Sequence, residues 1–556
     1  MSRYSMGIDF GTLSGRAVIV NIDTGEEMAA SVREYAHGVM ADKFVNGKGL
    51  PTDFALQHPK DYLETLYFVI RDCLAKSCID AADIVGVGVD FTACTILPVT
   101  REGTPLCFLE EYRENPHAYV KLWKHHAAQK EADEVNGLAR EMEVEWLKHY
   151  GGAISSEWML PKVLEIIRED EELYNETDRF VEAGDWIVWQ LAGLESHSIC
   201  TTGFKAAWNQ ETGYPDKEYL GRLDERLTNI VGDKLGTDIK KMSECAGYVT
   251  QEAAALTGLK EGTPVMPAFV DAHAALPALG ITSPGKLLLI MGTSTCHILL
   301  GEKEIYVPGI SGYVKDGIVD GYYAYEAGQA CVGDCFDWFV KKCVPGSYFE
   351  EAKEQGVSIY TLLDRKASEL GPGANGLLAL DWWNGNRTPY GNSSLTGTLV
   401  GLSISTTPEE IYRALIEATA YGTRNIIEIY EENGIKIDTI YAAGGIPEKN
   451  TMLMQIYADV TGREIYLADT TQSCAYGSAV LGASSEGGYG DLAEASLHMK
   501  KVKEKYYRPI GENTEIYDKL YAEYKKLSAY FADGDNGVME TLREIKQSKK
   551  RVFSES

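Results

Sequence analysis

Residues 6–20, MGIDFGTLSGRAVIV, place a short turn between two apolar stretches of β-forming residues. Gly11 and Gly15 can take the positive φ angles that a tight turn between strands uses, so the stretch predicts a β-hairpin. The turn also brings Asp9 and the hydroxyl of Thr12 next to glycine amides. Free amides beside hydroxyls form a cradle for anions, and a nearby carboxylate can hold a cation. A plain N-terminal hairpin explains the same residues, so the interpretation depends on whether the chain repeats the pattern.

Residues 285–300, GKLLLIMGTSTCHILL, do repeat it: a strand, a Gly-Thr-Ser-Thr turn and a second strand. Downstream of each hairpin, a segment with helical spacing leads into an apolar strand typical of strands buried on both faces. These pairs are residues 58–76 with 83–95, and residues 407–434 with 437–450. The chain therefore predicts two α/β halves of similar layout, whose two turns hold a polyphosphate from both sides.

The composition limits the partners of the protein. A chain of 556 residues is too long for one hydrophobic core, and 45% apolar with 24% charged residues is typical of globular proteins. The net charge of -29 argues against nucleic acid and anionic membranes as partners. We find neither an export signal nor an apolar stretch near the roughly 20 residues that span a bilayer, and therefore expect a cytoplasmic protein. The 11 cysteines lack paired CxxC spacing, which argues against zinc.

Three motifs, in this order, resemble those of the superfamily of sugar kinases, Hsp70 and actin: DFGT at 9–12, GTST at 292–295 and AAGGIPEKN at 442–450. The segment GTLVGLSISTTPEEIYRALIE at 397–417 resembles the second signature of the FGGY carbohydrate kinases, with a departure at Leu415. The resemblance implies an α/β fold of two ribonuclease-H-like domains around a central cleft. It places an N-terminal domain at 1–281, a C-terminal domain at 282–535 and a polar, frayed tail at 536–556.

The resemblance also implies ATP and Mg²⁺ as cofactors. No Walker A pattern, GxxxxGK[ST], occurs, so a metal ion and backbone amides must balance most of the phosphate charge. Asp9 is expected to hold magnesium through water. The remaining nucleotide-binding positions are Gly11, Thr12, Gly292, Thr293 and Ser294 for the phosphates, and Gly444, Gly445 and Asn450 for the adenosine.

Asp271 is the expected catalytic base. It ends the strand of GTPVMPAFVDAHAALPALG, residues 262–280, and precedes an alanine-rich helix. Asp at this place often caps the helix, but the carboxyl end of a strand in such a sheet also points at the ligand crevice. FGGY kinases carry their catalytic Asp in such a segment. The resemblance implies that Asp271 binds the sugar, accepts its proton and faces magnesium through water.

Three segments are candidates for the sugar pocket. Ala93 lies in DFTACT at 90–95, where small residues leave room for a ligand. Lys205 and Glu326 are charged residues in apolar surroundings, which is costly unless each finds a polar partner. A polyol provides such partners, and a structural ion pair explains both residues equally well. The tryptophan-rich segment DWWNGNR at 381–387 is interpreted as packing.

Four longer segments, at 115–128, 150–166, 182–193 and 203–209, resemble the FGGY members that phosphorylate L-ribulose. They imply ATP-dependent formation of L-ribulose 5-phosphate in L-arabinose catabolism. Two alternatives stay open: a kinase for another ketopentose or polyol, such as xylulose, ribitol or glycerol, and a non-catalytic sugar or nucleotide sensor. His125 stands where related kinases carry Asp, so neither it nor His126 receives a role. A homodimer also stays open.

Overall fold

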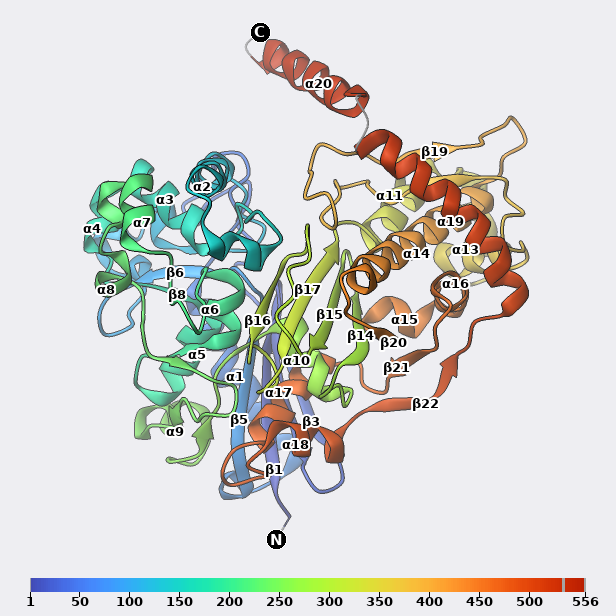
Figure 1. The fold of residues 1–556 in the computed structure, drawn as a ribbon. Coiled ribbons are helices and arrows are strands. Elements are labelled where there is room, and N and C mark those ends of the chain that lie inside the picture. The colour runs from blue at the N-terminus through green and yellow to red at the C-terminus, as the bar shows by residue number, and fades with distance from the viewer. Residues whose placement is uncertain (1, 533–535, 555–556) are drawn as a thin grey trace.

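Two mixed sheets, one from each half of the chain, organise the computed structural model, which describes residues 2–532 and 536–554 (Figure 1). In spatial order, the first sheet consists of β11 (Gly247–Tyr248), β12 (Pro264–Val265), β5 (Ile84–Phe91), β1 (Tyr4–Phe10), β2 (Ser14–Asn21) and β3 (Glu27–Glu34), with β13 (Phe269–Val270) paired to β5. The second sheet consists of β16 (Gly312–Lys315), β17 (Tyr323–Gln329), β15 (Thr295–Gly301), β14 (Gly285–Met291), β20 (Ile437–Ala443), β21 (Ile465–Ala468) and β22 (Val502–Tyr507).

The two sheets share one topology. In the first, β1, β2 and β3 form an antiparallel meander, and β5 runs parallel to β1. In the second, β14, β15 and β17 form the meander, and β20 runs parallel to β14. The internal repeat predicted from the two hairpins is therefore present in the fold.

Two helices lie between the sheets: α10 (Asp271–Ala278) and α17 (Ser473–Ala483). Their side chains share one hydrophobic core with the inner faces of both sheets. A Cβ on Gly7 would lie 1.9 Å from the carbonyl oxygen of Ala475, and one on Gly88 would lie 2.0 Å from that of Ser478. These glycines let α17 pack directly on β1 and β5, so a helix from the C-terminal half covers the sheet of the N-terminal half.

The outer faces are covered by other helices. On the first sheet, α1 (Pro59–Ser77) packs against the apolar residues of β1 and β5. On the second, α14 (Pro408–Glu432) begins with a capping box formed by Thr407 and Glu410, which satisfies the first amides of the helix. The other helices of the second half are α11 (Gly333–Cys343), α12 (Gly346–Glu354), α13 (Ile359–Ser368), α15 (Gly445–Lys449), α16 (Thr451–Thr461), α18 (Leu492–Met499) and α19 (Gly511–Ala532).

Residues between the strands of the first sheet build a separate subdomain around a four-stranded sheet, ordered β4 (Leu56–Gln57), β7 (Val120–Lys121), β6 (Ile96–Val99), β8 (Arg179–Glu182). The helices of this region and its surroundings are α2 (Gln129–Glu141), α3 (Met159–Glu169), α4 (Glu171–Glu176), α5 (Ala183–Ala192), α6 (Ile199–Lys205), α7 (Lys217–Leu223), α8 (Ile230–Asp233) and α9 (Gln251–Thr257). Two short pairs complete the strands, β9 (His197–Ser198) with β10 (Ile239–Lys240), and β18 (Leu378–Leu380) with β19 (Thr398–Val400).

The C-terminal residues differ from the frayed end that their polarity predicts. They contain a helix, α20 (Val538–Ser554), that projects from the body of the protein (Figure 1). The segment contains several Glu, Arg and Lys residues, which favour helix, and Met539 near its start is buried in the core of the second half. Within residues 2–532 and 536–554, no helix combines the length and apolarity that crossing a membrane requires.

Candidate active site

Three aspartates form the centre of the candidate site. Asp9 and Asp90 are register partners at the carboxyl ends of the parallel strands β1 and β5, so their side chains share the inner face of the sheet. Asp271 is the first residue of α10, directly after β13. We call these three residues the aspartate cluster. The first turn of α17 lies beside it, since all three aspartates act on the thiol of Cys474 and raise its pKa together with burial.

The three carboxyl groups of the cluster repel one another when charged. Burial, and then the neighbouring charge of Asp9, raise the pKa of Asp90 well above its ordinary value and that of Asp271 to about 7. The carboxyl groups of Asp9 and Asp90 are in hydrogen-bond contact, and Ser478 donates to Asp90 Oδ2 at 2.6 Å. Asp90 Oδ1 has no donor among the described residues. Buried carboxylate oxygens with unused capacity are suited to a hard cation.

Asp271 does not act as the helix cap. Val270 occupies the N-cap position of α10, and the Oδ1 of Asp271 accepts only from the neighbouring amide of Ala272, at 2.7 Å. The side chain is only partly buried. The carboxylate of Asp271 is therefore not needed to cap the N-terminus of α10.

The first turn joins two strands as predicted, but its glycines do not adopt the positive φ angles that the sequence analysis expected. Neither Gly11 nor Gly15 has a positive φ. Gly15 is required by packing instead, because a Cβ there would lie 2.7 Å from Thr65 Cγ2. Thr12 Oγ1 accepts from the indole of Trp123 at 3.1 Å, which leaves its own hydrogen free to donate. Next to the turn, Arg16 forms an ion pair with Asp9 at 3.2 Å.

The second turn, between β14 and β15, is open. The amide of Gly292 donates to Ser294 O at 2.9 Å, and Thr293 O accepts from the amide of Val332 at 2.8 Å. Gly292 and Thr293 are exposed, and Ser294 is partly buried. No described residue bonds the hydroxyls of Thr293 and Ser294, so both are free to donate to a ligand.

The adenosine motif follows β20. Gly444 has φ 105°, and a Cβ on it would lie 2.3 Å from Met291 O, so only glycine fits there. Gly445 faces open space. Asn450 caps α16 by accepting from Leu453 N at 2.8 Å and donates to Asp364 at 2.7 Å, so the protein already uses its amide. A pocket of about 290 Å³ adjoins Gly444.

Lys205 and Glu326 meet across the two domains. Lys205, at the end of α6, lies 3.0 Å from both carboxylate oxygens of Glu326 on β17. His273 binds the same carboxylate at 3.0 Å, and Lys205 Nζ lies 5.5 Å from the ring centroid of Trp158. Burial opposes the charge of Glu326, but Lys205 and His273 hold the pKa of its carboxyl well below the usual range. The two residues that the sequence suggested as sugar-binding therefore lie in contact, and each is the polar partner of the other.

Ala93 lies in a loop with a fixed conformation. The next residue, Cys94, has φ 54°, and its carbonyl accepts from the buried ammonium of Lys162 at 2.6 Å. Glu182 accepts from the amide of Thr95 at 3.0 Å. The loop therefore presents Ala93 on a rigid support.

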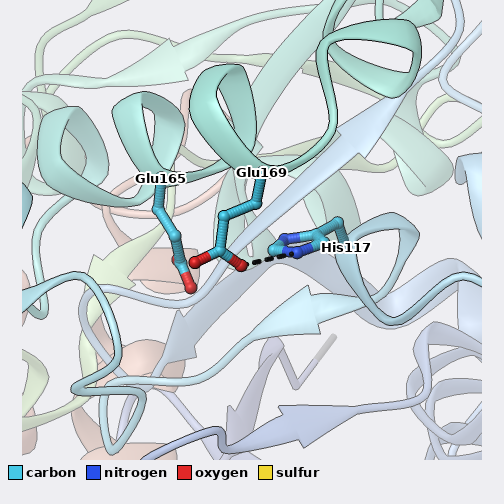
Figure 2. Close-up of side chains that lie close together, drawn as sticks. All are labelled: His117, Glu165 and Glu169. Atoms are coloured by element: carbon cyan, nitrogen blue, oxygen red, sulfur yellow. Dashed lines mark ion pairs between the residues drawn. The ribbon is translucent and has the colours of Figure 1, made fainter. Parts of the chain in front are cut away.

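A second cluster of charged residues lies in the subdomain, and we call it the closed cluster: Lys121, His117, His125, Glu165 and Glu169. Figure 2 shows Glu165 and Glu169, one helical turn apart on α3, beside His117. Three ligand atoms of this group lie close enough together to hold a metal ion. The space is used by an ammonium, since Lys121 Nζ lies 3.0 Å from Glu165 and 3.1 Å from His117 Nδ1.

The hydrogen-bond partners show which ring nitrogens of the two histidines carry a hydrogen. His125 Nδ1 accepts from the amide of Ala55, so its Nε2 donates to Glu165 at 2.9 Å. His117 Nδ1 accepts from Lys121, so its Nε2 faces Glu169 at 3.1 Å as a donor. Burial and Lys121 lower the pKa of His117 to about 4 and that of His125 to about 3, so both rings are neutral. Each ring N–H and the ammonium of Lys121 thus faces an acceptor, and we interpret the cluster as structural.

The structure adds site residues that the sequence analysis did not single out: Asp90, Arg16, Trp123 and Arg387. Asp90 and Arg16 lie inside segments quoted above, and a charged residue within an apolar strand was the available signal. Trp123 and Arg387 carry no such signal, because their proximity to the site arises only from the fold.

Comparisons with known proteins identify the family of this chain. Residues 4–278 match the N-terminal domain, and residues 287–486 the C-terminal domain, of the FGGY family of carbohydrate kinases. A ribulokinase of Bacillus licheniformis is 53% identical over 96% of this chain and 98% of its own length. One of Halalkalibacterium halodurans is 49% identical over 100% of this chain and 99% of its own.

Solved structures share the fold. A xylulose kinase from Rhodospirillum rubrum has a TM-score of 0.78 at 23% identity and covers 95% of this chain and 98% of its own. A gluconate kinase from Lactobacillus acidophilus has a TM-score of 0.80 at 17% identity and covers 96% and 99%. The predicted α/β fold of two related domains is confirmed. The chain belongs to the FGGY family of carbohydrate kinases.

Proposed function

We propose that this carbohydrate kinase transfers the γ-phosphoryl group of ATP to the 5-hydroxyl of L-ribulose, the reaction that forms L-ribulose 5-phosphate in L-arabinose catabolism. The substrate is supported by the ribulokinase relatives at 53% and 49% identity, which cover nearly the whole chain. The observation that carries the chemistry is the position of Asp271. It lies in the aspartate cluster, its pKa is raised to about 7 by burial and Asp9, and its carboxylate is not committed to capping.

Asp271 orients the 5-hydroxyl and accepts its proton while the sugar oxygen attacks the phosphorus. A base whose pKa lies near neutral is suited to this step. Lys205 and Glu326 bind sugar hydroxyls as donor and acceptor, and Ala93 leaves room for the sugar.

Two turns bind the nucleotide phosphates. The amides and hydroxyls of Gly11 and Thr12, and those of Gly292, Thr293 and Ser294, donate to the phosphate oxygens. Gly444 and Gly445 let the adenosine approach the backbone, with Asn450 at its edge.

The aspartate cluster fits Mg²⁺, because its carboxylate oxygens are hard ligands and Asp90 Oδ1 lacks a donor. Asp9 and Asp271 would hold the ion through water. When bound, Mg²⁺ would neutralise charge on the phosphates. Sequence features further predict a cytoplasmic enzyme without nucleic-acid or membrane partners, and a homodimer stays open.

A coupled assay of ADP release across L-ribulose, D-ribulose, both xyluloses, ribitol and glycerol tests the proposal. We expect the highest kcat/KM with L-ribulose. A higher kcat/KM with another polyol would identify that polyol as the substrate instead of L-ribulose. No turnover with any of them would favour a sugar or nucleotide sensor.

A further inference from the structure

Arg387 lies above the inner face of the second sheet, in the loop between β18 and β19. Its side chain covers Gly328 of β17, where a Cβ would lie 3.3 Å from Arg387 Cδ. The neighbouring residue anchors the loop, because Thr388 and Gly328 exchange two hydrogen bonds of 3.3 Å. These contacts fix the loop, and with it the backbone of Arg387, beside Gly328 of β17.

The strand register places this arginine between two parts of the proposed site. β15 leaves the second phosphate turn at Thr295, and Cys296 is the register partner of Gly328. Glu326, which lies two residues from Gly328 on the same face of β17, pairs with Ile298. Two residues of a strand span roughly 6.6 Å. Arg387 thus lies one such step from the turn and one step from the sugar-binding carboxylate.

The guanidinium has unused capacity. Within the described residues its one ion pair is with Glu157 of the N-terminal half, at 3.9 Å, and no side chain or carbonyl there accepts a hydrogen bond from it. Its side chain is 36% exposed. By contrast, the guanidinium of Arg413 in the same half bonds Glu417, Ala367 O and Tyr517. Arg387 therefore presents free donors at the junction of the two halves.

The surrounding charge is negative. Burial would lower the pKa of Arg387, but Glu157 and other acidic groups, including Glu326, raise it, so the side chain stays a cation. Arg387 and Asp271 both act on the thiol of Cys296, so a carboxyl group of the aspartate cluster lies in the same region. A phosphoryl group entering here needs a local cation from the protein, and a planar guanidinium can donate two parallel hydrogen bonds to phosphoryl oxygens.

We propose that Arg387 is a further catalytic residue, whose guanidinium binds the phosphoryl group during its transfer to the sugar. This inference rests on the proposed function. The bond between the γ-phosphorus and the bridging oxygen breaks, and ADP leaves with the electron pair. The bond from the sugar oxygen to phosphorus forms, and the hydroxyl proton passes to Asp271. Arg387 keeps its proton and binds the non-bridging oxygens on which negative charge lies.

The experiment compares two ligands that differ only in the phosphoryl group. Isothermal titration measures L-ribulose and L-ribulose 5-phosphate binding to wild type, Arg387→Ala and Arg387→Lys. Arg222→Ala is the matched control, because Arg222 on α7 forms an exposed ion pair with Glu141 on α2. We expect Arg387→Ala to weaken the sugar phosphate about ten- to hundredfold and the sugar less than twofold. The Lys variant should recover part of that loss, and kcat of the Ala variant should fall at least about a hundredfold.

An equal loss of affinity for both ligands would overturn the inference and indicate that Arg387 binds a sugar hydroxyl. Unchanged affinity for both would also overturn it. A wild-type protein that binds neither ligand would overturn the proposed function itself, and this inference with it. Melting temperatures equal to wild type exclude a folding defect as the cause of any loss.

Discussion

The aspartate cluster and the closed cluster are both groups of buried charges, and they differ in what remains unused. In the closed cluster, Lys121 is the central cation, and both ring N–H groups and the ammonium face acceptors. In the aspartate cluster, carboxyl groups face one another, and Asp90 Oδ1 has no donor among the described residues. Buried polar groups are normally satisfied. The comparison teaches that unused capacity, rather than burial or charge, marks the site that takes a ligand.

The largest expected effect is in the aspartate cluster. Asp271→Asn keeps the shape of the side chain but removes the proton acceptor, so kcat should fall about a hundred- to ten-thousandfold. Melting temperature and affinity for an ATP analogue should stay near wild type, since Val270 holds the cap position. Full turnover in the Asn variant would remove Asp271 from the mechanism and favour a sensor.

The closed cluster should respond in stability and not in chemistry. Glu165→Gln leaves the ammonium of Lys121 buried without its counter-charge, which should cost about 3–5 kcal/mol in free energy of unfolding. The folded variant should keep the wild-type kcat. Glu169→Gln is the matched control, since Glu169 is exposed and should cost about 1 kcal/mol or less. Urea unfolding measures both, and a kcat lost in Glu165→Gln would give the closed cluster a functional role.

The pKa of His197 is raised, in contrast to the lowered pKa values of His117 and His125. Burial lowers the pKa of His197, but Asp185 and Glu195 raise it to about 9. Because the folded pKa exceeds the ordinary 6.5, its stabilisation is complete below pH 6.5 and is lost as the pH rises to about 9. The difference in free energy of unfolding between wild type and His197→Gln should therefore shrink over this range, by at most about 3 kcal/mol. A difference independent of pH would show that His197 does not titrate there.

The Lys205–Glu326 pair lies between the two extremes, because its charges satisfy each other and we also propose that it binds the sugar. Lys205→Ala and Glu326→Ala should raise the sugar KM about ten- to hundredfold, and the ATP KM much less. Steady-state kinetics with each substrate varied in turn measures the split. A lower melting temperature with an unchanged sugar KM would make the pair structural, like the closed cluster.

The smallest effects are expected in the nucleotide turns. Thr12→Val keeps the shape but loses the donor hydrogen that Trp123 leaves free, and should weaken ATP binding about tenfold or less. Gly445→Val should weaken ATP through steric exclusion of the adenosine, since the position faces open space. Titration with a non-hydrolysable ATP analogue measures both. Wild-type affinity in the Gly445 variant would remove the adenosine assignment.

The sequence predicted the parts of the fold that depend on local chemistry. Alternating apolar residues and glycine turns define both hairpins, and the helices near 58–76 and 407–434 lie where their start signals placed them. The reason why a particular residue is required at a single position was less predictable. Gly15 is required by contact with Thr65 and Gly444 by contact with Met291, and such contacts depend on which segments meet in the fold.

By itself, the sequence determined two hairpins with glycine and hydroxyl residues in their turns, an aspartate at a strand end and the order of motifs that marks the family. These features are encoded within short stretches, where strand period, turn residues and the placement of a carboxylate act locally. Only the tertiary structure decided that α17 would bring Ser478 to Asp90, that Lys121 would close a cluster resembling a metal site, and that Arg387 would lie over Gly328 of β17. Each of these depends on residues far apart in the chain, and which buried groups are satisfied is settled only when those residues pack together.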